Sequence, residues 1–281
     1  MLGKLIKFEW RSTYRLMAAL NLALALLTMA GCCILIADIF GRQDMLPMAV
    51  LLLSLYALSL TAFGLATMLY LYVRFYRNLF ASEGYFMHTL PVTPMQLFHS
   101  KLAVGYVWMA LNSVLVTFSI FALLASILLH YAKIHGTEAL SQLLYGPGLQ
   151  SLSNGNFFDP FYEKFGYTAG QFFSKFLLLH LTSSFASLLT GYISILLGQL
   201  VEKYKRAASV GFYIVIYVVN QVVCSILMVI PTLQRLSGDS DKLFYHYFME
   251  IMDYGTVSQL IMGALFYGAA VFLMRRRVNL D

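Results

Sequence analysis

The chain has 281 residues, of which 60% are hydrophobic and only 11% are charged, whereas about 25% of the residues of an ordinary soluble domain are charged. This composition and the mean hydropathy of +0.73 exclude a soluble enzyme, a disordered chain and a nucleic-acid-binding domain. The net charge of +6 therefore indicates membrane topology rather than a nucleic-acid partner, because the basic residues lie between long apolar runs.

Several segments are long and apolar enough to cross a bilayer as helices. A spanning helix needs about 20 mostly apolar residues, because each residue adds about 1.5 Å across about 30 Å of hydrocarbon. No segment alternates like a strand of a membrane β-barrel. We therefore expect an all-α membrane protein, with residues 1–281 forming a single transmembrane domain. The six expected spans are Leu16–Ala37, Met48–Val73, Leu102–Leu129, Phe176–Val201, Ala207–Ile230 and Val257–Met274.

The distribution of charge predicts which side of the membrane each connection faces. Six spans place both termini on one side, together with the connections after the second and fourth spans. That side carries 13 of the 19 basic residues but only 4 of the 13 acidic ones. Because Lys and Arg favour the cytoplasm, both termini are predicted to be cytoplasmic, and the loops 130–175 and 231–255 to be external.

Residues 1–15 predict an amphipathic helix before the first span. Apolar residues recur there at spacings of three and four, and basic residues recur similarly on another face. Such a helix should lie in the cytoplasmic interface, with Trp10 at headgroup depth and the bases toward anionic lipid. The alternative is an ordinary basic flank that happens to be helical. The apolar stripe comprises Leu2, Leu5, Ile6, Trp10, Tyr14 and Met17, and the basic stripe comprises Lys4, Lys7, Arg11 and Arg15.

The segment 74–101 is too polar to span the membrane and too patterned to be a simple link. Thr93-Pro94-Met95-Gln96 has the form of a capping box. Thr93 would be the N-cap, Pro94 would occupy the first helical position, and Gln96 would reach back to the Thr93 backbone. A helix should therefore begin at Pro94 and continue into the third span.

The residues just before this helix predict a compact cytoplasmic protrusion. Ser82-Glu83-Gly84 should break the helix of the second span. A short element from Tyr85 to Leu90 should then lie across the membrane surface. Exposed apolar side chains in such a position often mark a protein contact.

Two stretches of the chain resemble type-2 permeases of bacterial ABC transporters. Arg74-Phe75-Tyr76, Asn78-Leu79-Phe80, Glu83-Gly84-Tyr85 and Thr89-Leu90-Pro91-Val92 resemble the loop after the second span of that family. The opening residues 2–10 resemble its N-terminal interfacial helix. In that family the loop contains a coupling helix, which docks in a groove of the ATPase subunit. The resemblance implies this role for Glu83, Gly84, Tyr85, Phe86, Met87, His88 and Leu90.

The resemblance also implies partners for the chain. The sequence has no GxxxxGK[ST] loop that would wrap phosphates, so two copies of a separate ATPase subunit, carrying ATP and magnesium, are implied. A second permease is implied as well, either identical or heterodimeric, since six spans enclose only half a pathway in that family. The expected location is the bacterial plasma membrane, with membrane lipids as neighbours and no nucleic acid.

The polar residues near the middle of the expected spans are uncharged. No full charge lies near the middle of an expected span, which argues against a proton- or ion-driven carrier. Tyr213, Tyr217 and Asn220 fall on one face of the fifth span, and Asn112 marks the third. These residues either form interhelical hydrogen bonds or line the transport route, and both interpretations stay open.

Other residues suited to chemistry are scattered. Cys32, Cys33 and Cys224 lie inside spans without metal-ligand spacing, so they are expected to be packing residues without a disulfide. The six histidines form no ligand pair and no catalytic set. We therefore expect no catalytic residue, no metal and no cofactor in this chain. Small residues of the fourth span predict a close packing seam, namely Ser183, Ser187, Gly191, Ser194 and Gly198.

The second external loop predicts a short helix after Asp239-Ser240-Asp241, carrying aromatic residues up to Met252. It either closes an outer gate, as in the resembling family, or rests on the outer leaflet as part of an aromatic belt.

The leading functional prediction is the permease subunit of an ATP-driven exporter for hydrophobic or amphipathic cargo, such as antimicrobial or toxin peptides. The alternative is a non-transporting membrane scaffold or sensor partner. An intramembrane enzyme would need convergent His, Asp or Glu within the spans, and the sequence offers none there.

Overall fold

The fold is a bundle of long helices. A computed structural model describes residues 2–36, 46–81, 92–136, 167–235 and 243–276, and the residues named below belong to these ranges. Six helices in this part of the chain each contain a stretch apolar and long enough to cross a membrane, which confirms the prediction of a multi-pass, all-helical membrane protein. The helices are α1 (Leu2–Ile36), α2 (Leu46–Phe80), α4 (Pro94–His135), α7 (Ala169–Gly198), α8 (Lys205–Arg235) and α9 (Leu243–Arg276).

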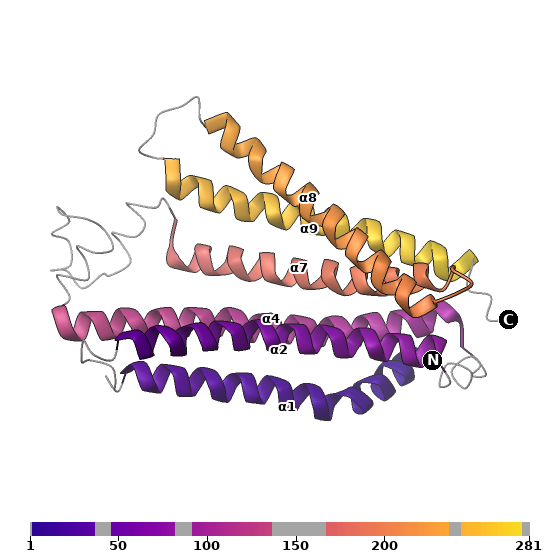
Figure 1. Cartoon of the computed structure of the whole chain (residues 1–281), viewed down its shortest axis with the longest axis horizontal. Coiled ribbons are helices and arrows are strands. Elements are labelled where there is room, and N and C mark those ends of the chain that lie inside the picture. Colours follow the sequence, from indigo (N-terminus) through magenta and orange to yellow (C-terminus); the bar gives the residue numbers. More distant parts are fainter. Residues whose placement is uncertain (1, 37–45, 82–91, 137–166, 236–242, 277–281) are drawn as a thin grey trace.

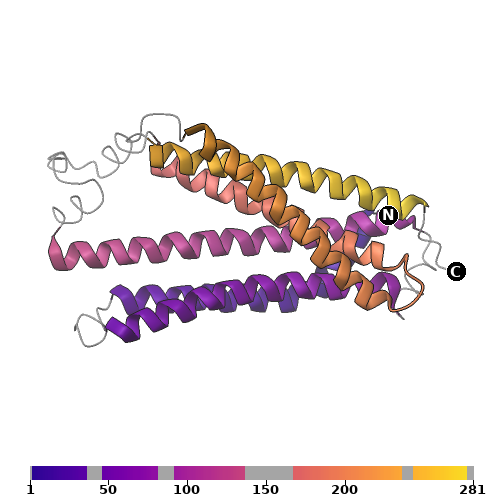
Figure 2. The ribbon, with the colours of Figure 1, turned by 45° about the horizontal axis from the view of Figure 1, so that its top comes forward.

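The helices form two groups of three. Figure 1 shows α1, α2 and α4 together on one side and α7, α8 and α9 on the other, with α8 crossing its neighbours obliquely. The main contact between the groups is made by α4 and α7. In Figure 2 the ribbons converge toward one end of the bundle and diverge toward the other. Helix α1 begins, α2 ends, α4 begins and α9 ends at the convergent end, which we call the N-terminal end; the opposite end is the distal end.

Helix α4 begins where the sequence predicts. Thr93 is the N-cap, Pro94 is the first helical residue, and the capping box is complete. The Gln96 backbone N–H donates to Thr93 Oγ1, and the Thr93 backbone N–H donates to Gln96 Oε1, each over 3.3 Å. Because these bonds satisfy backbone donors that would otherwise lack partners, the helix can start abruptly and run without interruption into the bilayer.

The predicted interfacial helix is not a separate element. Residues 2–36 form one continuous helix, which bends near its N-terminal end (Figure 1). No Pro occurs in this range, and both of its glycines, Gly3 and Gly31, are helical, so the backbone hydrogen bonds are not interrupted. The hydroxyls of Ser12 and Thr13 both donate to the Glu9 carbonyl oxygen, over 2.9 and 3.0 Å. Side-chain bonds of this kind bend helices, so they account for the curvature.

The apolar stripe of residues 1–15 is divided between the core and the surface. Leu5, Ile6 and Met17 pack against the protein core, whereas Leu2, Trp10 and Tyr14 are exposed. The first three residues therefore attach α1 to its neighbours, and the other three remain on the surface. The four bases remain exposed, as predicted.

Similar continuity holds for the elements that the sequence predicts to be external. Helix α9 begins at Leu243 and includes the residues predicted as a separate short external helix. Met249 and Met252 are buried, so apolar burial continues into the segment that the sequence assigns to a loop. Helices α4 and α7 likewise extend into the predicted loop 130–175. The predicted coupling element, residues 83–90, lies outside the described residues.

The best-packed part of the core lies around Tyr192 of α7. Its ring stacks on Phe75 of α2 with centroids 3.9 Å apart, and the side chain is 1% exposed. Gly191 lies directly against the ring of Tyr72, where a Cβ atom would overlap it, and Gly198 lies equally close to Ser209 of α8. The small residues of α7 therefore form a packing seam, as predicted, and its partners are α2 and α8.

Candidate functional site

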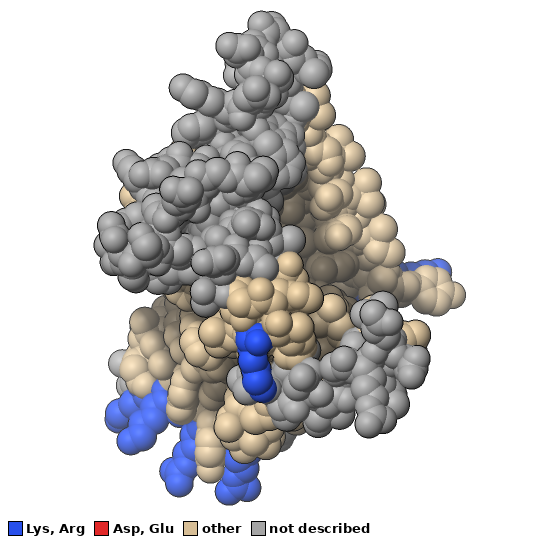
Figure 3. Space-filling view, turned by 90° about the vertical axis from the view of Figure 1, so that its left-hand side faces the viewer, with Lys and Arg blue, Asp and Glu red and all other residues tan. Residues whose placement is uncertain are grey.

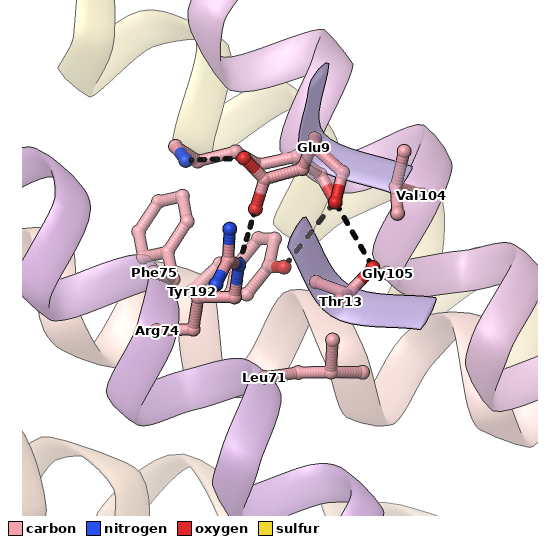
Figure 4. Close-up of a pocket in the computed structure, with 9 residues that line it drawn as sticks. Glu9, Thr13, Leu71, Arg74, Phe75, Val104, Gly105 and Tyr192 are labelled. Carbon is pink, nitrogen blue, oxygen red and sulfur yellow. Dashed lines mark hydrogen bonds and ion pairs between the residues drawn. The ribbon is translucent and has the colours of Figure 1, made fainter. Parts of the chain in front are cut away.

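Three charged side chains from three helices meet at the N-terminal end of the bundle. Glu9 of α1 accepts from Arg74 Nε of α2 over 2.6 Å, and its other carboxylate oxygen accepts from Lys101 Nζ of α4 over 3.1 Å. Figure 4 shows the Glu9 carboxylate pointing toward Arg74. We call Glu9, Arg74 and Lys101 the ionic joint.

The positions of these residues follow from the helix ends. Arg74 lies roughly two turns before α2 ends at Phe80, and Lys101 lies roughly two turns after α4 begins at Pro94. Glu9 lies on the face of α1 that turns toward the bundle, one turn before the buried Thr13. The ionic joint therefore ties α1 to the two helices that enter and leave the segment 82–91.

Hydrogen bonds and ring contacts surround the ionic joint. Thr13 Oγ1 accepts from Trp108 Nε1 over 3.0 Å, and Trp108 stacks on Trp10 with ring centroids 4.5 Å apart. Arg74 Nη2 also donates to Ser12 Oγ. These contacts fix the rotamers of the residues next to Glu9, so α1 and α4 meet in one defined register.

Helix α7 reaches the same place through an aromatic side chain. The Tyr192 hydroxyl donates to the Lys101 carbonyl oxygen over 3.4 Å. A Cβ atom at Gly105 would lie 2.8 Å from that hydroxyl oxygen, so glycine at this position permits the close approach of α7 to α4. The ionic joint thus lies where both helix groups touch.

Burial determines the energetics of the ionic joint. Glu9 is 5% exposed and Lys101 is 3% exposed. Removing one partner of such a buried pair leaves an uncompensated charge, which costs about 3–5 kcal/mol. The adjoining cavity is about 10 Å³, the size of a single water molecule. The site holds three helices together, and its cavity has no room for a molecule larger than water.

The predicted route residues do not form one site. Tyr213 of α8 faces α2, where its ring lies edge-on to Tyr72 at 5.8 Å and its hydroxyl donates to Met68 Sδ over 3.9 Å. Tyr217 stacks on Tyr213 but is 53% exposed on the outer surface of the bundle.

The two asparagines of the predicted set lie elsewhere. Asn220 accepts a 3.7 Å contact from Cys224 on its own helix, and Cys224 Sγ in turn accepts from Gln259 of α9. Asn112 is buried in the other helix group, with Gly64 of α2 as its neighbour. The three cysteines are free thiols.

A line of polar contacts follows the interface of α1 and α4. It runs from the ionic joint through the Thr13–Trp108 bond to Thr28, whose hydroxyl lies 2.7 Å from that of Ser119. Asn21 and Asn112 lie between these contacts, and Asn21 Oδ1 and Asn112 Nδ2 are buried atoms without a hydrogen-bond partner in the structure. We call this line the polar seam.

The polar seam ends at a cavity near the distal end. The Thr28 hydroxyl also lies 3.1 Å from that of Tyr56 on α2. Tyr56 lines an apolar cavity of about 230 Å³ between α1, α2 and α4, together with Gly31 and Leu123. Most of the other lining residues are aliphatic, so the cavity suits hydrocarbon rather than a polar ligand.

In the sequence, Glu9, Arg74 and Lys101 stand out as charges that set topology, and Glu9 and Arg74 also as parts of the two stretches that resemble type-2 permeases, but not as one site. One signal could have found the ionic joint. Glu9 is the first acidic residue in the chain, and it interrupts the apolar stripe of an otherwise basic segment. An acid on the packing face of a helix needs a buried base as partner, and the nearest strong candidates flank the predicted coupling loop.

Comparison with known proteins adds no assignment: no family model matches the chain, and no curated protein or solved structure matches it. Among the residues that the structure describes, no group of three His, Cys, Asp or Glu side chains could hold a metal ion. The ionic joint and the polar seam are therefore the features on which a functional argument can rest.

Proposed function

We propose that this chain is the membrane subunit of an ATP-driven exporter in the bacterial plasma membrane, with both termini in the cytoplasm. Separate ATPase subunits would bind ATP and magnesium, and a second permease subunit would complete the pathway. The observation that carries the proposal is the ionic joint. It connects α1 to α2 and α4 near the segment whose sequence resembles the coupling region of type-2 ABC permeases.

The mechanism would be mechanical. A movement of residues 83–90 by the ATPase would reach α2 and α4 directly, because their ends flank this segment. The ionic joint would carry it to α1, so the three helices would move as one body. The contact between α4 and α7, which includes the hydroxyl pair of Ser113 and Ser184, would then be the surface along which the two helix groups shift.

The proposed cargo is hydrophobic or amphipathic, with antimicrobial or toxin peptides as the favoured class. Beyond the ionic joint, the polar groups of the polar seam are hydroxyls, amides and one indole N–H, and the cavity beside Tyr56 is lined largely by hydrocarbon. Neither feature would offset the free-energy cost of removing a strongly charged cargo from water.

Co-purification tests the proposal. The tagged chain should co-purify with an ATPase in stoichiometric amount. Replacing residues 83–90 by a Gly/Ser linker should abolish that association while the chain still folds. Transport of candidate peptides into vesicles with ATP would then establish export. A chain that purifies without any nucleotide-hydrolysing partner contradicts the proposal, and a normal ATPase complex after the linker replacement contradicts the coupling assignment. Neither outcome depends on the ionic joint variants described below.

A further inference from the structure

The first turns of α1 carry opposite charges on opposite faces. Lys4, Lys7, Arg11 and Arg15 follow one another at spacings of three and four, and all four are exposed. At about 100° per residue they share one side of the helix. Glu9 is two residues from both Lys7 and Arg11, which places it on the opposite side. We call the four bases the basic face.

The basic face points away from the bundle. Figure 3, which views the molecule from the distal end, shows Lys and Arg side chains gathered along the lower edge, where α1 lies, and no described acid on the visible surface. The acid nearest in sequence, Glu9, is engaged in the ionic joint on the other side of the helix. Among the described residues, no acid forms an ion pair with the basic face.

Exposed aromatic side chains flank the basic face. Phe8 is 57% exposed, Trp10 39% and Tyr14 41%. Aromatic rings next to basic residues are typical of the headgroup region of a bilayer, and juxtamembrane bases are attracted to anionic lipid surfaces. Leu5, Ile6 and Met17 of the same segment pack against protein, so these residues are not available for insertion into the interface.

We propose that the basic face of α1 binds the anionic headgroups of phospholipids in the leaflet at the N-terminal end of the bundle. This binding holds the outer side of the helical turns whose inner side forms the ionic joint. Loss of anionic lipid therefore weakens the contact of α1 with α2 and α4. The inference concerns the chain alone and does not depend on an ATPase partner.

The chain contains its own reporter for this test. It has two tryptophans: Trp10 beside the basic face and Trp108, which is only 4% exposed. The chain is reconstituted without other proteins into phosphatidylcholine nanodiscs. Brominated phosphatidylglycerol or brominated phosphatidylcholine with the same acyl chains is then introduced over the same series of mole fractions. A Trp10→Phe variant gives the signal of Trp108 alone.

We expect brominated phosphatidylglycerol to quench Trp10 at a several-fold lower mole fraction than brominated phosphatidylcholine, and 0.5 M salt to weaken that preference. One base at a membrane surface contributes about fivefold to affinity, so changing all four bases to Gln should remove the preference. A variant with Lys4→Arg, Lys7→Arg, Arg11→Lys and Arg15→Lys keeps the charge and should keep the preference. The matched control changes four exposed bases elsewhere to Gln, namely Lys133, Lys203, Lys205 and Arg275.

Three outcomes would overturn the inference. The first is equal quenching of the unmodified chain by the two lipids. The second is a preference that survives removal of the basic face. The third is an equal loss in the control variant, which would mean that net charge rather than this face attracts the lipid. If the bases prove necessary only for binding an acidic partner protein, the first outcome results. Circular dichroism confirms that each variant is folded.

Discussion

The two ends of the α1–α2–α4 group are built differently. At the N-terminal end the ionic joint, of which Glu9 and Lys101 are buried, and the stacked pair of Trp10 and Trp108 leave a cavity of only about 10 Å³. At the distal end the same three helices surround an apolar cavity of about 230 Å³, and the polar contacts are hydroxyl pairs. Close packing transmits displacement, whereas a void allows neighbouring groups to adjust. The group is thus densely packed at one end and more loosely packed at the other.

The largest effect should come from the ionic joint. Glu9→Gln leaves two bases facing a neutral group in a buried site and should lower the free energy of unfolding by about 3–5 kcal/mol. Chemical unfolding in detergent micelles, followed by circular dichroism, measures the change. Glu202→Gln is the control, because Glu202 is exposed.

A triple variant distinguishes a lost charge balance from a general intolerance of the site. Glu9→Leu, Arg74→Leu and Lys101→Met together remove all the charges, and replacements of this kind are often neutral or stabilising. We expect stability close to that of the unmodified chain, with loss of ATP-dependent transport if the ionic joint carries motion. A single Glu9→Gln variant that unfolds like the unmodified chain would contradict the assigned role.

A pair of glycine substitutions compares the packing of the two ends. Gly191→Ala places a methyl group inside the ring of Tyr72, and overpacking of this kind costs about 1–3 kcal/mol. Gly31→Ala places its Cβ 3.8 Å from the ring of Tyr56, an ordinary contact. Since alanine favours helices over glycine by about 0.5–1 kcal/mol, we expect Gly31→Ala to be neutral or slightly stabilising. Equal effects in unfolding experiments would refute the contrast between the ends.

The smallest effect should be at the hydroxyl pairs of the distal end. Tyr56→Phe removes the contact with Thr28, while Thr28 keeps its 2.7 Å contact with Ser119. Side-chain hydrogen bonds within membrane bundles average about 0.6 kcal/mol, so the free energy of unfolding should fall by about that amount. A loss as large as that of Glu9→Gln would show that the distal end is also held firmly.

The sequence predicts the features that local chemistry determines. Apolar runs locate the six spans, and Thr93 with Gln96 locates the start of α4. It does not predict the continuity of α1 and α9, because polar and aromatic residues near a span end are compatible with either a break or an extension. It also does not reveal the ionic joint, since Glu9 and Lys101 are 92 residues apart and meet only through tertiary packing.

The uninterrupted length of α4 has a further consequence. Its 42 residues extend about 63 Å at 1.5 Å per residue, twice the roughly 30 Å thickness of the hydrocarbon layer. A rod of that length acts as a lever. Tilting it by about 5° around the Pro94 end would carry the His135 end sideways by about 5 Å. A small tilt of α4 at one face of the membrane would thereby displace its other end by about the size of a side chain.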